Sequence, residues 1–437
     1  MATTDEILWN VVQTHLDEAE FLFQQWSAAA QSPRLSLVDV RKTIERRLLA
    51  HLDGLAVGGA AVAEKLLWPV VAADTEAPAS TVAAAALALL LLPDPQTPER
   101  LLQAFRATEN ESLARGLARA CKVAPRSDID ESLRLALYAT DSPAAQTALL
   151  DVLAARRVDP GPILGVLLTH PEAEVVRAAL GAAAAVIDRD RLRQRLDDCL
   201  AHAAAPVRAA AVRTGLIWNL STAWRACTTE ARAGSPEAMF LLALIGGADA
   251  VAQISPALQR PERRKAALFA LGFTGLLAAV DACLPFLDDP DAVVARLAVE
   301  AIASITGLPL YESAFARASD DDAGDDELPP LEEDLRIDLM PLPHDDLPLP
   351  DGPKVRDWWS KQRSSFATND RYLRGAPLST ATVNDALEAG PLRRSGALTC
   401  EIAIRSGGRV QLAALRLAHR TPTLPVEVSL QRKPAWR

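Results

Sequence analysis

The residues of this 437-residue chain that are best suited to chemistry are two histidines and three acids near the N-terminus. His15, Asp17 and Glu18 fall on one predicted helix, and His51 and Asp53 fall on the next. Imidazole and carboxylate groups brought together can bind a metal or act as general acid and base on a small molecule. Both histidines, however, lie on the apolar faces of their helices, where a packing role is the commoner outcome. We therefore expect packing, and a small-molecule site at these five residues is the alternative.

The other potential ligands and nucleophiles are too dispersed to form a known motif. The four remaining histidines have no partner at H-x-x-x-H spacing, and no two cysteines form a C-x-x-C pair. The pairs Gly58-Gly59 and Gly246-Gly247 lack the G-x-x-x-x-G-K pattern of a phosphate loop, and there is no G-x-S-x-G elbow. We expect no catalytic residue, no metal and no cofactor. The five cysteines, which we expect to be buried in a reducing compartment, are Cys121, Cys199, Cys227, Cys283 and Cys400.

The features best suited to binding a protein lie near the C-terminus. Trp358 and Trp359 are candidate anchors, because tryptophan is enriched at binding hot spots. Successive helical side chains point about 100° apart, so the two rings cannot be equally buried. The Leu-Pro segment before them interleaves apolar and acidic residues as a docking peptide does, and Asp345, Asp346 and Leu347 are its candidate contacts. Alternatively, one tryptophan packs the C-terminal helices and the acidic segment only solvates a linker.

Helix starts of one kind recur through the middle of the chain. Prolines followed by alanine-rich helical runs are spaced 25 to 35 residues apart, and an acid follows most of them, which complements the positive end of the helix dipole. A repeat of about 30 residues that forms two antiparallel helices cannot bury its own apolar face, so the repeats must stack into a solenoid. The prolines are Pro143, Pro171, Pro206, Pro236, Pro261 and Pro290, with weaker starts near Pro78 and Asn110.

This pattern resembles HEAT repeats, most closely over residues 289–302. The resemblance implies an all-α, HEAT-like α-solenoid of stacked antiparallel helix pairs. Among HEAT-repeat enzymes, the deoxyhypusine hydroxylases hold a di-iron site with repeated His-Glu pairs, but this sequence contains no His-Glu dipeptide. Bilin lyases use similar repeats, and a likeness to them rests on the repeats alone.

Both ends of the chain resemble a bacterial family of HEAT-repeat proteins that is associated with type VI secretion gene clusters. The N-terminal likeness runs from Trp9 through Phe21-Leu22-Phe23 to residues 50–55. The C-terminal likeness is the tryptophan pair followed by the R-Y-L-R-G turn at residues 371–375. The resemblance implies a cytoplasmic accessory role, as an adaptor or chaperone for a secretion effector or spike component.

The patterns divide the chain into five parts. In the first part, Ser36 and Asp39 predict a capping box for a helix that ends near Gly54. Residues 319–351 hold 13 acids, one arginine and six prolines, and so charged a stretch cannot bury enough apolar surface to fold. The parts are an N-terminal helical cap (1–75), a repeat array (76–308), an acidic Pro-rich linker (309–352), a C-terminal helical region (353–420, with helices near 383–387, 395–404 and 410–417) and a tail (421–437).

Charge and hydropathy argue against nucleic acids and membranes as partners. The net charge of −10 is concentrated in residues 319–351, which repel phosphate and leave the array nearly neutral. The apolar run 82–92 is too short to span a bilayer, and the first residues lack the basic start of a secretory signal. Arg177, Arg208 and Arg264 are candidate partner contacts, and the alternative is an ion-pair ladder between repeats.

These observations together predict a cytoplasmic, non-enzymatic scaffold that binds a protein partner and neither binds nucleic acid nor inserts into a membrane. The alternative is an enzyme or modification factor, bilin-lyase-like or other, with a small-molecule site on the N-terminal helices. A third hypothesis is self-regulation, in which the acidic arm folds back on arginines of the array.

Overall fold

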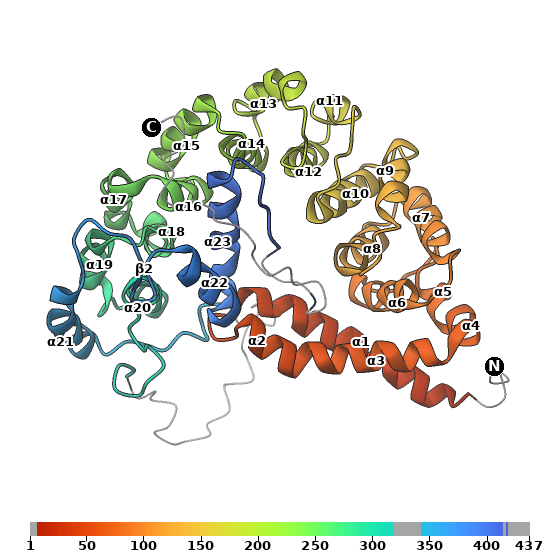
Figure 1. Ribbon diagram of the computed structural model, residues 1–437, viewed down its shortest axis with the longest axis horizontal. Helices are drawn as coiled ribbons and strands as arrows, with labels where there is room; N and C mark the ends of the chain where they lie inside the picture. The colour runs from red at the N-terminus through yellow and green to blue at the C-terminus, as the bar shows by residue number, and fades with distance from the viewer. Residues whose placement is uncertain (1–6, 318–341, 414–416, 418–437) are drawn as a thin grey trace, which may run out of the picture. The chain divides into compact units, whose positions relative to one another are not determined.

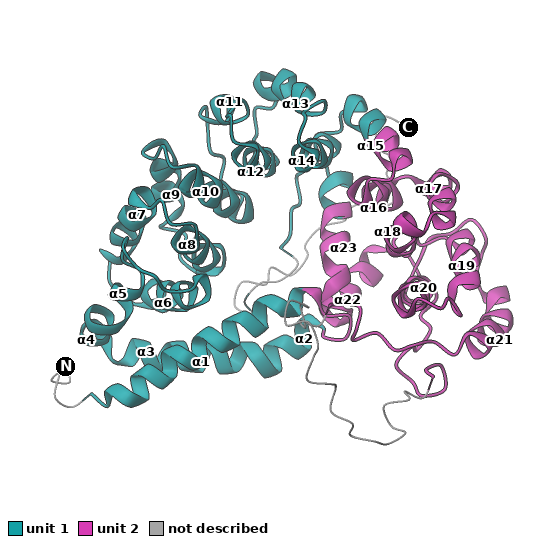
Figure 2. Cartoon of the chain, turned by 180° about the vertical axis from the view of Figure 1, so that it is seen from behind, with its two compact units in different colours: residues 1–30, 36–226, 402–437 teal, residues 31–35, 227–401 magenta. Residues whose placement is uncertain are grey.

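The computed structural model describes residues 7–317, 342–413 and 417. Most of these residues lie in helices, and their one sheet is a two-stranded hairpin. The prediction of an all-α, HEAT-like solenoid is confirmed. The chain forms two compact units (Figure 2): unit 1 contains residues 1–30, 36–226 and 402–437, and unit 2 contains residues 31–35 and 227–401. Each unit therefore combines repeats with segments that are distant in the sequence.

Unit 1 opens with two long antiparallel helical segments (Figure 1). Helix α1 (Trp9–Ala28) buries an apolar stripe against α3 (Arg46–Val57). The short α2 (Leu37–Val40) precedes α3, and a π-helical segment (Arg41–Glu45) joins them. The predicted capping box is present, because the Ser36 Oγ accepts from the Asp39 N–H and Asp39 Oδ2 accepts from the Ser36 N–H.

The prediction that this second segment ends near Gly54 is wrong. The helix continues to Val57, and Gly54 lies in its interior. A Cβ at Gly54 would lie 2.8 Å from Nε2 of His15, so the glycine makes room for that imidazole on α1. The glycine is therefore a packing residue and not a helix terminator.

The repeats of unit 1 follow the predicted spacing. Five alanine-rich helices pack one on the next, and shorter helices lie on their other side (Figure 1). Their starts fall within two residues of the predicted positions. The packed series is α6 (Ala79–Leu91), α8 (Glu111–Val123), α10 (Pro143–Arg156), α12 (Ala173–Ala183) and α14 (Ala205–Ile217). The remaining helices are α4 (Gly59–Val62), α5 (Trp68–Val70), α7 (Thr97–Ala107), α9 (Asp130–Tyr138), α11 (Leu164–Leu167) and α13 (Arg193–Cys199).

Unit 2 continues the same pattern. Helices α16 (Pro236–Ile245), α18 (Pro261–Leu271) and α20 (Ala292–Thr306) pack in series, and α17 (Gly247–Ile254) and α19 (Leu277–Cys283) lie on their other side. Helix α15 (Ser221–Ala233) begins in unit 1 and ends in unit 2. The C-terminal elements are α21 (Gly352–Gln362), β1 (Tyr372–Leu373), β2 (Ala376–Pro377), α22 (Thr380–Ala389) and α23 (Leu392–Arg405). Residues 402–405 at the end of α23 belong to unit 1.

The C-terminal predictions are confirmed in part. Helices α22 and α23 cover the predicted stretches 383–387 and 395–404. The third predicted helix is wrong at residues 410–413, which are not helical. Gly407 and Gly408 adopt positive φ angles of 64° and 78°, a conformation that ends helices. The predicted tail 421–437 lies outside the described residues.

Both described ends of the predicted acidic linker are held together within unit 2. Ala316 and Pro350 form an isolated antiparallel bridge. The Arg317 N–H donates to the Leu349 carbonyl at 2.9 Å, and the Asp351 N–H donates to the Phe315 carbonyl at 2.8 Å. Residues 318–341, which contain most of the acids, lie outside the described residues. No helix within the described part of the chain is long and apolar enough to cross a membrane.

Candidate functional site

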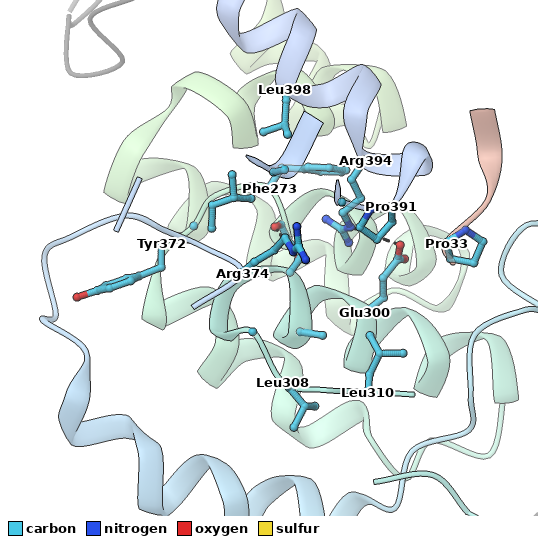
Figure 3. A pocket seen from close by; sticks show the side chains of 18 of the residues that line it. Pro33, Phe273, Glu300, Leu308, Leu310, Tyr372, Arg374, Pro391, Arg394 and Leu398 are labelled. Atoms are coloured by element: carbon cyan, nitrogen blue, oxygen red, sulfur yellow. Dashed lines mark hydrogen bonds and ion pairs between the residues drawn. The ribbon is translucent and has the colours of Figure 1, made fainter. Parts of the chain in front are cut away.

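A cavity of about 560 Å³ lies within unit 2 (Figure 3). Its walls come from the ends of α18 and α20, the loop after α20, residues 33–34 near the N-terminus, the hairpin, and helices α22 and α23. Most of the lining is apolar, and four arginines and three glutamates interrupt it. The charged residues are Arg34, Arg371, Arg374, Arg394, Glu300, Glu312 and Glu401.

The hairpin that forms one wall is held against the repeats by backbone hydrogen bonds. Its three bonds to the repeats run from the N–H groups of Tyr372, Arg374 and Gly375 to the carbonyls of Gly275, Ser304 and Ile305, at 2.7, 2.8 and 2.9 Å. Two glycines allow this approach. Gly275 and Gly307 have φ angles of +71° and +75°, and a Cβ at Gly307 would lie 2.7 Å from the Arg374 carbonyl oxygen. The ends of α18 and α20 therefore need glycine in order to receive the hairpin.

A second wall comes from the segment 31–35, which is far from the rest of unit 2 in the sequence. Its carbonyls at Ser32, Pro33 and Leu35 accept from the Arg393 N–H (3.1 Å), the Tyr311 hydroxyl (2.9 Å) and the Leu392 N–H (2.9 Å). The Arg34 guanidinium lies 4.9 Å from the centre of the Tyr311 ring. Burial raises the pKa of Tyr311 to about 12, so its hydroxyl stays protonated and remains a donor.

Arg371 is fully engaged. Its guanidinium makes a bidentate bond to Glu401, at 2.5 Å from Nη1 and 3.2 Å from Nη2. It also donates to the Thr274 carbonyl at 2.8 Å and to the Phe273 carbonyl at 3.3 Å. These bonds connect the hairpin both to α23 and to the end of α18.

The charges around Glu300 are arranged differently. Arg393 Nε and Arg394 Nε approach the same Glu300 oxygen, Oε1, at 3.5 and 3.4 Å. Glu300 is 5% exposed and Arg394 is 8% exposed. Burial lowers the pKa of Arg394, because it disfavours the charged form. The Arg394 guanidinium lies 4.3 Å from the centre of the Phe273 ring, and Figure 3 shows it between this ring and Glu300.

Several polar atoms of this cluster have no hydrogen-bond partner within the described structure. They are Oε2 of Glu300, both Nη atoms of Arg394 and Nη1 of Arg393. Buried polar groups are normally hydrogen-bonded, so this is a site where polar groups remain to be satisfied. The cavity thus has an apolar body and one end with an excess of buried positive charge.

Of the predicted partner contacts near the C-terminus, Trp359 and Leu347 are packed within unit 2. Trp359 is only 3% exposed, whereas Trp358 is half-buried, as expected for adjacent helical side chains. Leu347 is 2% exposed and lines the cavity. Asp345 and Asp346 are exposed, and Asp345 lies 3.5 Å from an arginine of α20, Arg296.

The predicted arginines bond to groups on their own or neighbouring repeats. In unit 1, Arg177 binds Glu174 at 2.7 Å and lies 3.7 Å from Asp151 on the preceding packed helix. Arg208 donates to two carbonyls of the loop before its helix, those of His202 and Ala203. In unit 2, Arg264 binds Asp289 at 3.2 Å. The pairs of Arg177 with Asp151 and of Arg264 with Asp289 connect successive repeats, as an ion-pair ladder requires.

Of the five N-terminal residues considered for a small-molecule site, the structure brings together the two histidines. Nδ1 of His15 lies 3.0 Å from Nδ1 of His51. Burial, and then the neighbouring His15, lower the pKa of His51. Asp17 accepts from a neighbour on its own helix, and Asp53 is exposed. No group of three or more His, Cys, Asp or Glu residues within the described ranges has the arrangement of a metal site.

The cysteines agree with the prediction, with one exception. Four are buried and Cys400 is half-buried. Burial raises the pKa of Cys121, Cys227 and Cys283 to about 12. A thiol with so high a pKa is unreactive near neutral pH.

Sequence interpretation did not single out the residues at the charged end of the cavity. One signal was present: Glu300 is the only acid in the otherwise apolar stretch of α20, and an acid there is seldom buried without a partner. Arg393-Arg394 likewise begins a largely apolar helix. Nothing in the sequence, however, indicates that these two elements meet.

Comparison with known proteins adds little. No protein-family model and no curated protein matches the chain. Among solved structures, human deoxyhypusine hydroxylase in complex with glycerol is 20% identical, with 55% of this chain and 94% of that chain covered and a TM-score of 0.23. An engineered protein is 19% identical, with 65% and 88% covered and a TM-score of 0.27. Likenesses this weak say nothing about the function of this chain.

Proposed function

We propose that this protein is a non-enzymatic scaffold that receives a segment of a partner protein in the cavity of unit 2. The observation that carries the proposal is the cavity itself, about 560 Å³ with largely apolar walls. That volume is within the range of ligand sites, which combine apolar walls with a few oriented polar groups. The seated hairpin and the Arg371–Glu401 pair hold the walls in place.

A protein segment is the occupant that the walls favour. One of the wall residues, Leu347, belongs to a segment of this chain, residues 342–350, in which leucines and prolines flank two aspartates. The cavity region therefore already accommodates a leucine that follows an aspartate. A partner segment of the same chemistry would find similar surroundings.

The resemblance to the family associated with type VI secretion extends this proposal. On that basis the partner is a secretion effector or spike component, and the protein acts as a cytoplasmic adaptor or chaperone that holds it before loading. The proposal has no metal, cofactor or catalytic residue.

Photo-crosslinking in the native cell tests the scaffold proposal. Benzoylphenylalanine replaces Leu310, which is half-buried at the cavity, or Val166, which is 69% exposed on α11 and serves as control. We expect a protein adduct from position 310 that Ala389→Trp abolishes, because Ala389 lines the cavity. Ala381→Trp, on the exposed side of the same helix, should leave the adduct intact. An adduct that persists in Ala389→Trp, or no adduct at all, contradicts the proposal.

A second candidate function, an enzyme or modification factor, is favoured by one observation, the contact of His15 with His51. If these residues act on a small molecule, His51→Ala and Asp53→Ala should leave the free energy of unfolding unchanged. If they pack, His51→Ala should lower it and Asp53→Ala should not. Urea unfolding of the variants distinguishes the two.

A further inference from the structure

We propose that the cavity recognises a carboxylate carried by an apolar segment of the partner, and that Arg394 binds this carboxylate. This inference rests on the proposed function and adds the chemistry of the ligand. The starting point is an imbalance of buried charge. Two guanidinium groups, from Arg393 and Arg394, share one oxygen of Glu300.

The existing bonds do not satisfy these guanidinium groups. Charge-assisted N–H···O bonds are typically about 2.7 to 2.9 Å long, whereas the two approaches to Glu300 are 3.4 and 3.5 Å. Both Nη atoms of Arg394 are buried, and neither has a hydrogen-bond partner among the described residues. A buried charge is stable only when it is paired and hydrogen-bonded, so a further anion improves the site.

The orientation of the Arg394 guanidinium is fixed by its neighbours. One side of the guanidinium faces the Phe273 ring at 4.3 Å. Gly272 lies against its nitrogens, since a Cβ there would be 2.8 Å from Nη2. The planar fork is therefore fixed in orientation, and a carboxylate that reached both Nη atoms at once would satisfy them.

Arg371 shows what a satisfied arginine looks like in the same cavity. It has a bidentate carboxylate partner in Glu401 and two carbonyl acceptors. Arg394 has one weak contact with a carboxylate that it shares with Arg393. The two cavity-lining arginines therefore differ in that Arg371 has its own bidentate carboxylate partner, whereas Arg394 shares one carboxylate oxygen with Arg393.

The surroundings favour a carboxylate over a phosphate. Glu300 presents an unpartnered oxygen, Oε2, beside Arg394, and a phosphate dianion would meet stronger repulsion from it than a carboxylate would. The remaining walls are largely apolar and suit a leucine-like body next to the charged group. Leu347, which follows two aspartates and lines the cavity, is an example of that combination within this chain.

The crosslink at position 310 tests the inference when Arg394 is changed to Gln. Losing a bidentate, charge-assisted bond should reduce the adduct at least about tenfold. Arg374→Gln is the matched control, because Arg374 also lines the cavity but is already paired with Asp385 at 3.3 Å. We expect the control to stay within about twofold of the unmodified protein. An undiminished adduct from Arg394→Gln overturns carboxylate recognition and leaves the scaffold proposal standing.

Thermal unfolding of the purified full chain gives an independent test, with octanoate and octanol as probes that differ only in the head group. Octanoate should raise the melting temperature of the unmodified chain and of Arg374→Gln, but not that of Arg394→Gln. Arg394→Lys keeps the charge and should respond weakly. Equal shifts from octanoate and octanol, or an undiminished octanoate shift in Arg394→Gln, overturn the inference. An octanoate shift that requires Arg394, combined with no protein adduct at position 310, supports carboxylate binding by Arg394 but refutes a protein partner as the carrier of the carboxylate.

Discussion

Substituting Gly307 tests how the cavity wall is built. This residue follows α20 with a φ of +75°, and its Cα faces the carbonyl of Arg374 in the hairpin. In Gly307→Ala, the new Cβ would lie 2.7 Å from that oxygen and 2.9 Å from its carbon, both of which are backbone atoms. The contact cannot be relieved by rotating a side chain, so either the hairpin or the end of α20 must move.

The expected loss of stability has two contributions. An alanine in the left-handed region costs about 1 to 2 kcal/mol, and the steric clash costs about 1 to 3 kcal/mol. We therefore expect Gly307→Ala to lower the free energy of unfolding by roughly 2 to 5 kcal/mol. The matched control is Gly396→Ala, inside α23, where an added Cβ meets no atom within 4 Å. That substitution should instead stabilise by about 0.5 to 1 kcal/mol, because alanine favours the helix.

Urea unfolding of the full chain measures both variants, and hydrogen exchange shows where the loss occurs. In Gly307→Ala, protection should fall in the hairpin at residues 372–377, whose backbone is bonded to the repeats, before it falls in α18. A variant within 0.5 kcal/mol of the unmodified protein, with an unchanged hairpin, refutes the proposed seating. If Gly396→Ala lowers the free energy of unfolding, the free space around the added Cβ does not decide whether this substitution stabilises the protein.

Three further predictions concern other parts of the chain. Burial and the neighbouring histidine hold the pKa of His51 below its usual 6.5. At pH values between the folded and the unfolded pKa, the unfolded chain therefore binds more protons than the folded chain. The free energy of unfolding should fall as the pH is lowered through 6.5, and His51→Gln should flatten this slope in urea titrations at several pH values. Arg371→Met breaks a buried pair and should cost about 3 kcal/mol, whereas Arg374→Met breaks an exposed pair and should cost less than about 1 kcal/mol; equal losses in urea unfolding would argue against the difference in burial. Burial raises the pKa values of Cys227 and Cys283 to about 12, so both should resist iodoacetamide at pH 8 until urea unfolds the chain. Mass spectrometry measures the labelling, and rapid modification of the native protein would contradict their burial.

The repeats were predictable because their signals are local. A proline or a capping residue lies within two residues of the start of each packed helix, and the apolar face of the helix repeats with the helical period. Asn110, for example, accepts from two backbone N–H groups at the start of α8, although the sequence marked that start only weakly. Such signals need no knowledge of distant segments.

The cavity was not predictable, because its walls meet through long-range backbone contacts. The R-Y-L-R-G turn stands out in the sequence, but its position against the repeats depends on Gly275 and Gly307, which lie about a hundred and about seventy residues earlier. The segment 31–35 joins unit 2 through carbonyl groups, which have no side-chain signature in a sequence. Gly54 shows the same limitation, since its role depends on the space that the His15 imidazole occupies on another helix.

The Leu-Pro segment with Asp345 and Leu347, which was expected to dock a partner, also indicates what a partner would contact in the cavity. Leu347 is part of the cavity wall, so its side chain can contact a partner only within the cavity, whereas the neighbouring Asp345 is exposed and pairs with Arg296. An acidic, leucine-bearing partner segment would meet the same kinds of groups, an arginine and an apolar wall, that this segment already meets. Binding of such a partner would therefore add to the contacts of Leu347 if it enters beside this wall, and would compete with them if it replaces the leucine. Leu347→Ala separates the two cases, because it should weaken the crosslink at position 310 in the first and strengthen it in the second.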